Sequence, residues 1–460
     1  MTRRFTLSGA LVLLLASSGA PGAPARHAGT GPTASSGVAA PVGFAAVASP
    51  SPIPSPAAAP SAQPQLAVAS DGSILLSWLE DAGSGRHRFR FARRLRDGWS
   101  EPVLVHEGDR FFANWADVPA VFPAPDGTLF AHWLEKSGPE TYAYDVKVRV
   151  SADGGATWSS PITLHRDRTR TEHGFVSWFP VPGGAGAIWL DGRDLVAGDG
   201  EHAPRGRMSL RATMLRGATP QAEALVDPQV CECCPTAAAA TSRGAIVAYR
   251  DRSDEEIRDI AVARFEQGRW SRPVVAHADN WRIPGCPVNG PALAARGDRV
   301  ALAWFTAADG ARVNVAFSSD GGATFGPPVR VDDGDPLGRV DVELLSDGSA
   351  LVGWIERLAP GAAFRVRRVA ADGGRDEAIT VAPVSPGRSS GYPRLAVGGE
   401  EILFAWVADG RVNIAAVAAP GRPSRTAPPG SPARAGRSAA DRPPRLAPRR
   451  PGSRDTRPPG

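Results

Sequence analysis

Apolar residues recur along the middle of the chain in short runs, and each run ends in an aromatic side chain. Small and β-branched residues dominate these runs, which is typical of strands rather than helices. Successive aromatics are 55, 56, 60, 55, 50 and 52 residues apart, and a period in this range indicates a repeated supersecondary unit. The seven aromatics are Trp78, Trp133, Trp189, Tyr249, Trp304, Trp354 and Trp406.

Each repeat has the pattern of four short antiparallel strands. The apolar run at 129–133 follows the turn at Asp126 and Gly127, as expected for a hairpin. After the aromatic come a polar loop, a third strand at 146–150 and a fourth at 162–164. Four-stranded antiparallel units in series predict an all-β fold, the β-propeller, with one blade per unit.

The seven aromatics predict seven blades. The last unit, from Tyr392 to about residue 419, supplies only three strands, so a strand from the other end of the chain is needed to close the ring. The apolar patch at 42–47 is the candidate for that strand. Six blades with a spare hairpin is the alternative.

Both ends of the chain differ in composition from the repeats. Residues 1–25 have the charged, apolar and small-residue parts of a signal peptide, with cleavage expected after Ala25. Residues 26–63 are predicted to be an Ala/Pro/Ser-rich linker, 64–419 the propeller, and 420–460 a disordered Pro/Arg-rich tail. We therefore expect an exported protein, periplasmic or extracellular, with no membrane span.

Charge is unevenly distributed along the chain. The net charge is +5, but ten arginines and two aspartates give residues 420–460 a charge of +8, and three arginines give residues 1–64 a charge of +3. Subtracting both leaves −6 for residues 65–419. A mildly acidic propeller argues against nucleic acid as a partner.

Two turns between third and fourth strands carry one motif. Residues 151–158 read Ser-Ala-Asp-Gly-Gly-Ala-Thr-Trp, and residues 318–325 read Ser-Ser-Asp-Gly-Gly-Ala-Thr-Phe. Both resemble the Asp-box, or BNR repeat, Ser-x-Asp-x-Gly-x-Thr-Trp, of the sialidase superfamily, and the resemblance covers about residues 64–419. An Asp that accepts backbone N–H groups, with glycines that permit positive φ, stabilises a hairpin. The motif thus indicates the fold and not the chemistry.

The two ends of a four-stranded blade carry different residues. The Asp-boxes lie at one end, whereas the loops after the second strand and the connections into the next blade lie at the other. That second end gathers arginines, carboxylates and aromatics, a combination suited to an acidic sugar. The candidate substrate-binding residues are Arg193, Arg250, Arg282, Arg339, Trp115 and Trp281.

The resemblance also implies catalytic roles. Sialidases use three arginines on the carboxylate of the sugar, an Asp as acid/base, and a Tyr activated by a Glu as nucleophile. By resemblance, Asp117 is the candidate acid/base, Tyr392 the candidate nucleophile, and Glu172 or Glu256 its activator. The expected partner is a carbohydrate, and the expected activity is binding or exo-sialidase-type hydrolysis of an acidic glycan. A non-enzymatic scaffold or binding module is the alternative, and oligomeric state stays open.

All four cysteines fall at the same predicted end as these residues. They are Cys231, Cys233, Cys234 and Cys286. In an exported protein an even number predicts disulfides, with three possible pairings. The alternative is a soft-metal site, because the Cys-x-Cys-Cys segment concentrates three thiols. We expect no other cofactor.

Overall fold

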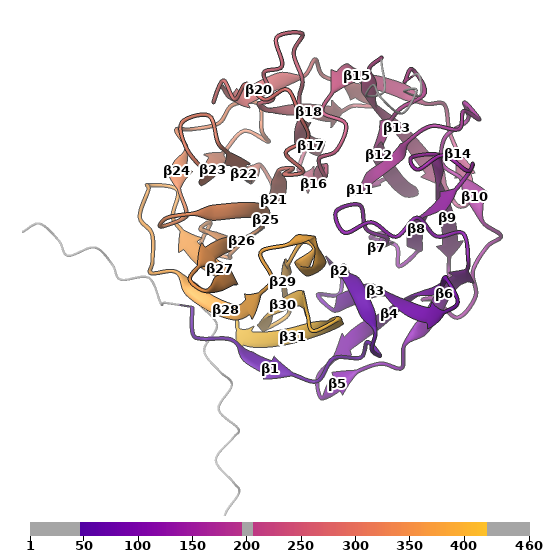
Figure 1. Cartoon of the computed structure of the whole chain (residues 1–460), viewed down its shortest axis with the longest axis horizontal. Coiled ribbons are helices and arrows are strands. Elements are labelled where there is room, and N and C mark those ends of the chain that lie inside the picture. The colour runs from indigo at the N-terminus through magenta and orange to yellow at the C-terminus, as the bar shows by residue number, and fades with distance from the viewer. Residues whose placement is uncertain (1–46, 196–205, 421–460) are drawn as a thin grey trace, which may run out of the picture. The chain divides into compact units, whose positions relative to one another are not determined.

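The described residues of the computed structural model, 47–195 and 206–420, form seven antiparallel sheets arranged around a common axis (Figure 1). This confirms the predicted all-β propeller and its seven blades. Within this part of the chain the only helical element is the short turn η1 (Arg388–Ser390), and no helix is long and apolar enough to cross a membrane. The predicted signal peptide and residues 421–460 of the predicted tail lie outside the described residues.

The position of a strand within its blade sets its distance from the axis. The innermost strands are β2 (Ser61–Val68), β7 (Ala120–Pro123), β11 (His173–Val181), β16 (Ala237–Thr241), β21 (Ala292–Arg296), β25 (Pro336–Leu344) and β29 (Arg394–Gly398). The second strands are β3 (Ile74–Gly83), β8 (Leu129–Lys136), β12 (Gly184–Asp191), β17 (Gly244–Arg250), β22 (Arg299–Thr306), β26 (Ala350–Leu358) and β30 (Glu401–Ala408). The third strands are β4 (Arg86–Leu95), β9 (Tyr144–Ser151), β13 (Met208–Arg216), β18 (Ile260–Glu266), β23 (Arg312–Ser318), β27 (Gly361–Val369) and β31 (Arg411–Ala418).

The outer edges of the blades are less regular. In three blades the third strand is paired along its outer edge by two short strands. These are β5 (Gly98–Trp99) and β6 (Val103–Gly108) on β4, β14 (Thr219–Pro220) and β15 (Ala224–Val230) on β13, and β19 (Arg269–Trp270) and β20 (Val274–His277) on β18. In three others one strand forms the edge: β10 (Ile162–Thr163), β24 (Val329–Arg330) and β28 (Ile379–Val384).

The ring is closed by an N-terminal strand, as predicted, but a different one. Strand β1 (Ser51–Ile53) pairs with β31, with Ser51 opposite Ala416 and Ile53 opposite Ile414. Residues 42–46 of the predicted closing strand lie outside the described residues, and Val47 is buried without forming a strand. Strand β1 lies within the segment that composition alone indicated as a linker.

The aromatics of the repeat anchor the core. All seven lie on second strands, and six are at most 1% exposed, with Trp406 at 7%. Neighbouring blades share each apolar cluster: Trp133 of β8, for example, packs in one cluster with Leu75 of β3 and Phe91 of β4. The aromatic period is therefore the period of the contacts between blades.

The Asp-boxes fold as their motif predicts. Asp153 Oδ1 accepts from the Thr157 backbone N–H at 2.9 Å and Oδ2 from the Thr157 hydroxyl at 2.6 Å, and Ser151 Oγ accepts from the Gly155 N–H at 2.8 Å. The second box makes the same set of bonds around Asp320. Gly155 has φ +99° and its Cβ position is filled by the Phe91 ring, so glycine is required there.

The two ends of the blades form two rims. The Asp-box rim comprises the turns at 69–73, 151–158 and 318–325. The connection rim comprises the loops and connections at 109–119, 164–172, 231–236, 251–259, 278–291 and 385–393.

Candidate functional site

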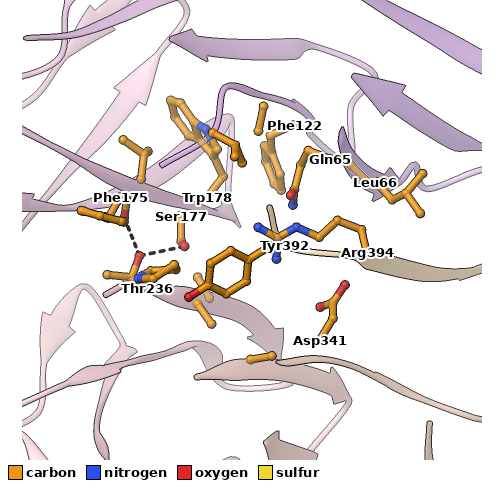
Figure 2. A pocket seen from close by; sticks show the side chains of 18 of the residues that line it. Gln65, Leu66, Phe122, Phe175, Ser177, Trp178, Thr236, Asp341, Tyr392 and Arg394 are labelled. Atoms are coloured by element: carbon orange, nitrogen blue, oxygen red, sulfur yellow. Dashed lines mark hydrogen bonds between the residues drawn. The ribbon is translucent and has the colours of Figure 1, made fainter. Parts of the chain in front are cut away.

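A cavity of about 290 Å³ lies on the propeller axis (Figure 2). The innermost strands of all seven blades line it, together with Asp117, Pro235 and Tyr392 of the connection rim. Its volume is at the small end of the range of about 300–1,000 Å³ that is usual for ligand pockets. The cavity can hold a ligand of about the size of one sugar.

Three polar groups of the cavity lining have unused hydrogen-bonding capacity. The Arg394 guanidinium makes no hydrogen bond or ion pair within the described part of the chain, and its Nε is buried. Gln65 Oε1 and Asp117 Oδ2 are also buried without a partner there. Figure 2 shows Gln65 and Arg394 extending toward the same space. Because buried polar atoms are nearly always paired, these groups are available to water or to a ligand in the cavity.

Beside the cavity, Asp117 belongs to an acid cluster with Glu172 and Tyr144. Tyr144 donates its hydroxyl to Glu172 Oε1 at 2.7 Å. A Cβ at Gly174 would meet both Asp117 Oδ2 and the Tyr144 ring, at 2.0 and 3.1 Å, so these two side chains are neighbours. Burial raises the pKa of Asp117 well above its usual value, and the charge of Glu172 raises it further. Burial likewise raises the pKa of Glu172 to about 7 against the opposing effect of the Tyr144 hydrogen bond.

The sequence analysis named two members of this acid cluster and missed Tyr144. A weak signal was available, since Tyr144 is one of only four tyrosines and stands two residues before the predicted strand at 146–150, at the functional end. Its pairing with Glu172, 28 residues away, is a matter of three-dimensional proximity.

Tyr392, the predicted nucleophile, lies in the cavity lining without a carboxylate partner. Its hydroxyl donates to the backbone carbonyl of Val288 at 2.6 Å, and its ring stacks on Trp115 with centroids 6.0 Å apart. Burial raises the pKa of Tyr392 above its usual value. The structure therefore does not bring Tyr392 together with either Glu172 or Glu256.

Arg250 is held by the protein itself. It is 1% exposed and donates to the backbone carbonyls of Asn289, Arg258 and Phe305 at 2.6–2.8 Å. The Trp281 ring covers the guanidinium, 4.8 Å from Cζ to the ring centroid. Arg250 and Trp281 thus tie three segments together and present no open face to a substrate.

Arg339 and Trp115 form a similar pair. Arg339 donates to the Gly387 carbonyl at 2.8 Å and to Ser390 Oγ at 2.6 Å, and its Cζ lies 4.7 Å from the Trp115 ring centroid. Of the four arginines predicted to bind substrate, only Arg282 is exposed.

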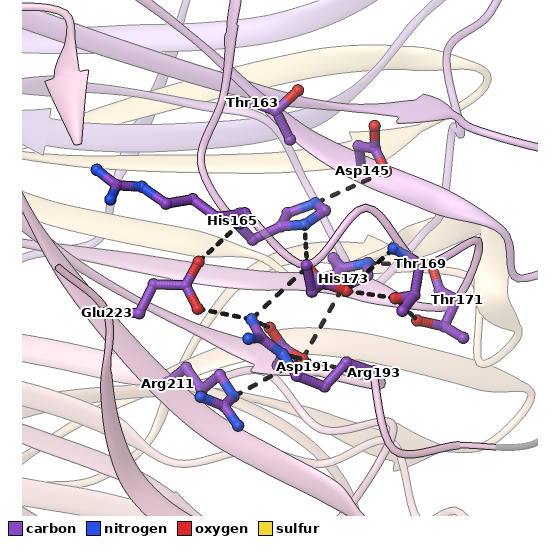
Figure 3. Close-up of polar contacts among 12 residues, drawn as sticks. Asp145, Thr163, His165, Thr169, Thr171, His173, Asp191, Arg193, Arg211 and Glu223 are labelled. Carbon is purple, nitrogen blue, oxygen red and sulfur yellow. Dashed lines mark hydrogen bonds and ion pairs between the residues drawn. The ribbon is translucent and has the colours of Figure 1, made fainter. Parts of the chain in front are cut away.

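Arg193 belongs to an ionic network between the blade of β7–β10 and the blade of β11–β15 (Figure 3). Its guanidinium contacts Asp191 at 2.6 Å. In the same network the rings of His165 and His173 stack with centroids 3.6 Å apart, and Asp167 bonds both imidazoles at 2.7 and 3.1 Å. Although burial alone would lower it, the hydrogen bond that the imidazole donates to Asp167 raises the pKa of His173. Arg193, Arg250 and Arg339 are thus distributed among separate internal contacts.

Glu256 lies on the connection rim and, among the described residues, accepts no hydrogen bond from a tyrosine hydroxyl. It accepts from Arg258 Nη2 at 2.8 Å and from Arg252 Nε at 3.1 Å. The hydrogen bond from Arg252 is the main cause that lowers the pKa of Glu256. Glu256 is therefore a charged partner of arginines.

The four cysteines gather at one place on the connection rim, as predicted, but all four are free thiols. The Sγ atom of Cys231 lies 3.3 Å from that of Cys234 and 3.9 Å from that of Cys233, whereas bonded sulfurs lie about 2.05 Å apart. Cys286 lies outside the group of three sulfurs that are all within 4.8 Å of one another, and the Cys233 thiol lowers the pKa of Cys286. The structure therefore does not show the predicted disulfides, and three of the sulfurs form a close group.

A guanidinium supports this thiol cluster (Cys231, Cys233, Cys234 and Cys286). Arg258 Nη1 lies 3.2 Å from Cys231 Sγ and 2.8 Å from Glu232 Oε2. Burial alone would raise the pKa of the Cys231 thiol. The hydrogen bonds from the Cys233 and Cys234 thiols, together with the charge of Arg258, instead hold this pKa well below its usual value.

Comparisons with known proteins give solved structures of low similarity and no match by sequence. No protein-family model matches the chain, and no curated protein matches its sequence. A protein of unknown function from Dyadobacter fermentans is 14% identical over 78% of this chain and 94% of its own, with a TM-score of 0.44. A K499G mutant of the NanB sialidase from Streptococcus pneumoniae is 12% identical over 82% of this chain and 70% of its own, with a TM-score of 0.39. The polysaccharide lyase Uly1 is 10% identical over 79% of this chain and 91% of its own, with a TM-score of 0.47. Solved structures similar to this chain therefore include sialidases, at low identity.

Proposed function

We propose that this protein is an exported, sialidase-like propeller that binds a sugar acid, as part of an acidic glycan, in the cavity on its axis. The observation that carries the proposal is the Arg394 guanidinium, which lines the cavity and makes no hydrogen bond or ion pair within the described residues. A guanidinium in a concave site is suited to bidentate binding of a carboxylate.

Other groups of the cavity lining suit the rest of a sugar. Ser177 and Thr236 bring hydroxyl groups to the lining, 2.8 Å from each other, and Gln65 brings an unpaired amide oxygen. Burial raises the pKa of Asp117 and of Asp341 above their usual values, which weakens their repulsion of an anionic ligand. The charge of Arg394 acts in the opposite direction on the pKa of Asp341. The cavity lining therefore joins one fixed cation to hydroxyl, amide and carboxyl groups.

Calorimetric titration tests this proposal. We expect N-acetylneuraminate or D-glucuronate to bind and D-glucose, which has no carboxylate, not to bind. Arg394→Gln should weaken binding about tenfold or more, the value of a charged hydrogen bond. Arg411→Gln, which changes an exposed arginine on β31 of the same blade, is the matched control and should bind like the wild type. Failure of both acids to bind the wild type, or equal loss in both variants, would refute the proposal.

A second candidate, hydrolysis of a glycoside, is favoured by the Tyr144–Glu172 hydrogen bond beside Asp117. The sialidase resemblance implies a tyrosine nucleophile activated by a glutamate. Tyr144 is fully buried in the apolar core and is not part of the cavity lining, so this reaction requires a local opening beside Asp117 through which the substrate reaches the phenol. Glu172 would then take the phenolic proton as Tyr144 attacks the anomeric carbon. Protonated Asp117 would give its proton to the oxygen of the departing group.

A fluorogenic sialoside assay separates the two tyrosines. If Tyr144 is the nucleophile, Tyr144→Phe should lower kcat by a factor of at least 100, whereas Tyr392→Phe should keep most of the activity. The reverse result would restore the nucleophile predicted from the sequence. No turnover by the wild type would leave the protein as a binding module, without affecting the test on Arg394.

A further inference from the structure

The thiol cluster has the dimensions of a metal site. The sulfurs of Cys231, Cys233 and Cys234 all lie within 4.8 Å of one another, with two separations of 3.3 and 3.9 Å. In a tetrahedral thiolate site with metal–sulfur bonds of about 2.3 Å, the sulfurs are about 3.8 Å apart. The three sulfurs therefore already have nearly the spacing that one central ion requires.

The fourth thiol comes from a different part of the chain. Cys286 belongs to the connection between β20 and β21, whereas the other three belong to the connection between β15 and β16. Its sulfur lies outside the group of three that are all within 4.8 Å of one another, so Cys286 must move inward to complete a four-sulfur site, which its exposed position on a connection allows. Cys231 and Cys234 are buried, Cys233 is half-buried and Cys286 is exposed. The cluster thus has an enclosed side, where water is excluded, and a side that faces solvent, through which an ion can enter.

Charged neighbours fix the innermost thiol. The Arg258 guanidinium contacts Cys231 Sγ at 3.2 Å and is itself held by Glu232 and Glu256, each at 2.8 Å. A cation beside a thiol stabilises the thiolate, which is the form that binds metals. Outer groups of this kind hold ligands in place and tune their affinity.

We propose that the protein binds one thiophilic d¹⁰ metal ion, Zn²⁺ or Cu⁺, through Cys231, Cys233 and Cys234, with Cys286 as the fourth ligand. Thiolates are soft ligands and select these ions over Mg²⁺ and Ca²⁺. This site is separate from the sugar-acid cavity, and neither proposal depends on the other. A bound ion would join the two connections, so metal loading should raise the thermal stability of the propeller.

The first test uses the full chain, reduced and stripped with a chelator under argon. Zn²⁺ and Cu⁺ are titrated separately against competing chromophoric chelators. We expect one ion per chain, a raised Tm, and four thiols that lose their reactivity toward a disulfide reagent on loading. X-ray absorption at the metal edge should give three to four sulfur neighbours. The ion with the lower Kd identifies the preferred metal.

Variants then assign the ligands. Cys286→Ser changes an exposed residue and should leave the core packing intact. It should weaken the affinity for the metal ion at least tenfold. Cys231→Ser should abolish stoichiometric binding. Arg258→Gln should weaken binding about 10–100-fold without changing the number of sulfur neighbours. Glu255→Gln, an exposed change in the same loop, is the control and should bind like the wild type.

Two results would overturn the proposal. One is a chain with four titratable thiols that takes up neither ion at micromolar concentration. The other is protein whose denatured, unreduced form has fewer than four titratable thiols, which would show that disulfides form from these cysteines in solution. A Cys286→Ser variant with unchanged affinity would remove that residue from the ligand set and would contradict the four-thiol site.

Discussion

Individual carboxyl groups on the two rims show opposite pKa shifts. On the Asp-box rim, hydrogen bonds from Thr157 lower the pKa of Asp153 to about 2. On the connection rim, burial raises the pKa of Glu172 to about 7 and that of Asp251 to about 6. The first carboxylate is stabilised as an anion by a residue four positions away, whereas the other two are removed from water with too few donors.

This contrast separates stability from function. A turn whose partners are close in sequence can satisfy its carboxylate locally, as the bonds from Thr157 to Asp153 do in the Asp-box. The connections carry side chains whose partners lie on other blades, and some polar groups there, such as Asp117 Oδ2, have no partner in the described part of the chain. Unsatisfied groups cost free energy in the unliganded protein, and a ligand can recover it.

The largest effect on stability is expected at Arg250, which joins three backbone segments of the molecule through hydrogen bonds. Arg250→Met removes a guanidinium that serves three backbone carbonyls and leaves those carbonyls buried without donors. We expect a loss of about 3–5 kcal/mol in the free energy of unfolding, measured by urea denaturation. Arg282→Met, in an exposed position of the connection rim, should change it by less than about 0.5 kcal/mol. Equal effects would show that Arg250 is not a structural tie.

An intermediate effect is expected from pH. A carboxyl whose pKa is raised by folding keeps a proton that the unfolded chain has already released, so stability falls as pH rises through that interval. For Glu172 the interval runs from its ordinary 4.5 to about 7, and for Asp251 from 3.8 to about 6. We expect the Tm to drop by roughly 5 °C between pH 5 and pH 8.

Glu172→Gln should flatten this slope, because the amide cannot ionise but its carbonyl can still accept from Tyr144. The Asp-box rim should lose stability only at acidic pH. Asp153, whose pKa is lowered from 3.8 to about 2, loses its stabilising charge only as pH falls through that range. A Tm that rises from pH 5 to pH 8 would contradict the assignment of raised pKa values to the connection rim.

The smallest effect is expected within a single Asp-box. Asp320→Ala removes the acceptor of two bonds from Thr324 and should lower the Tm by about 2–4 °C, with sugar-acid and metal affinity unchanged. Asp309→Ala, at an exposed loop of the same blade, should leave the Tm unchanged. An Asp320 variant with altered ligand affinity would show that the rims are coupled.

The fold could be predicted because its signals are local and repeated. One aromatic every 50–60 residues marks each of the seven blades, and the turn chemistry of the two Asp-boxes acts within a single hairpin. Seven copies of the aromatic strand leave little ambiguity. The closing strand could not be located in this way. Strand β1 has only three residues, largely exposed, and it owes its structure to the free edge of β31. The more apolar patch at 42–47 gave the stronger local signal.

Residue types at the site could be predicted better than their partners. The connections identified Asp117, Glu172 and the cysteines, but which tyrosine meets Glu172 depends on distances between blades. Tyr392 finds the Val288 carbonyl, 104 residues away in sequence, and Arg250 finds three carbonyls. Backbone acceptors have no sequence signature, so arginines that serve them look the same as arginines free for a ligand.

Strand β1 also bears on the order of events when the chain is made. The residues that complete the seventh sheet leave the ribosome first, and their partner strand, β31, leaves among the last. Six sheets can pair as they emerge, but the seventh must wait for its opposite edge. Synthesis halted before residue 411 would yield an open arc with an unpaired border, a form prone to associate with other chains.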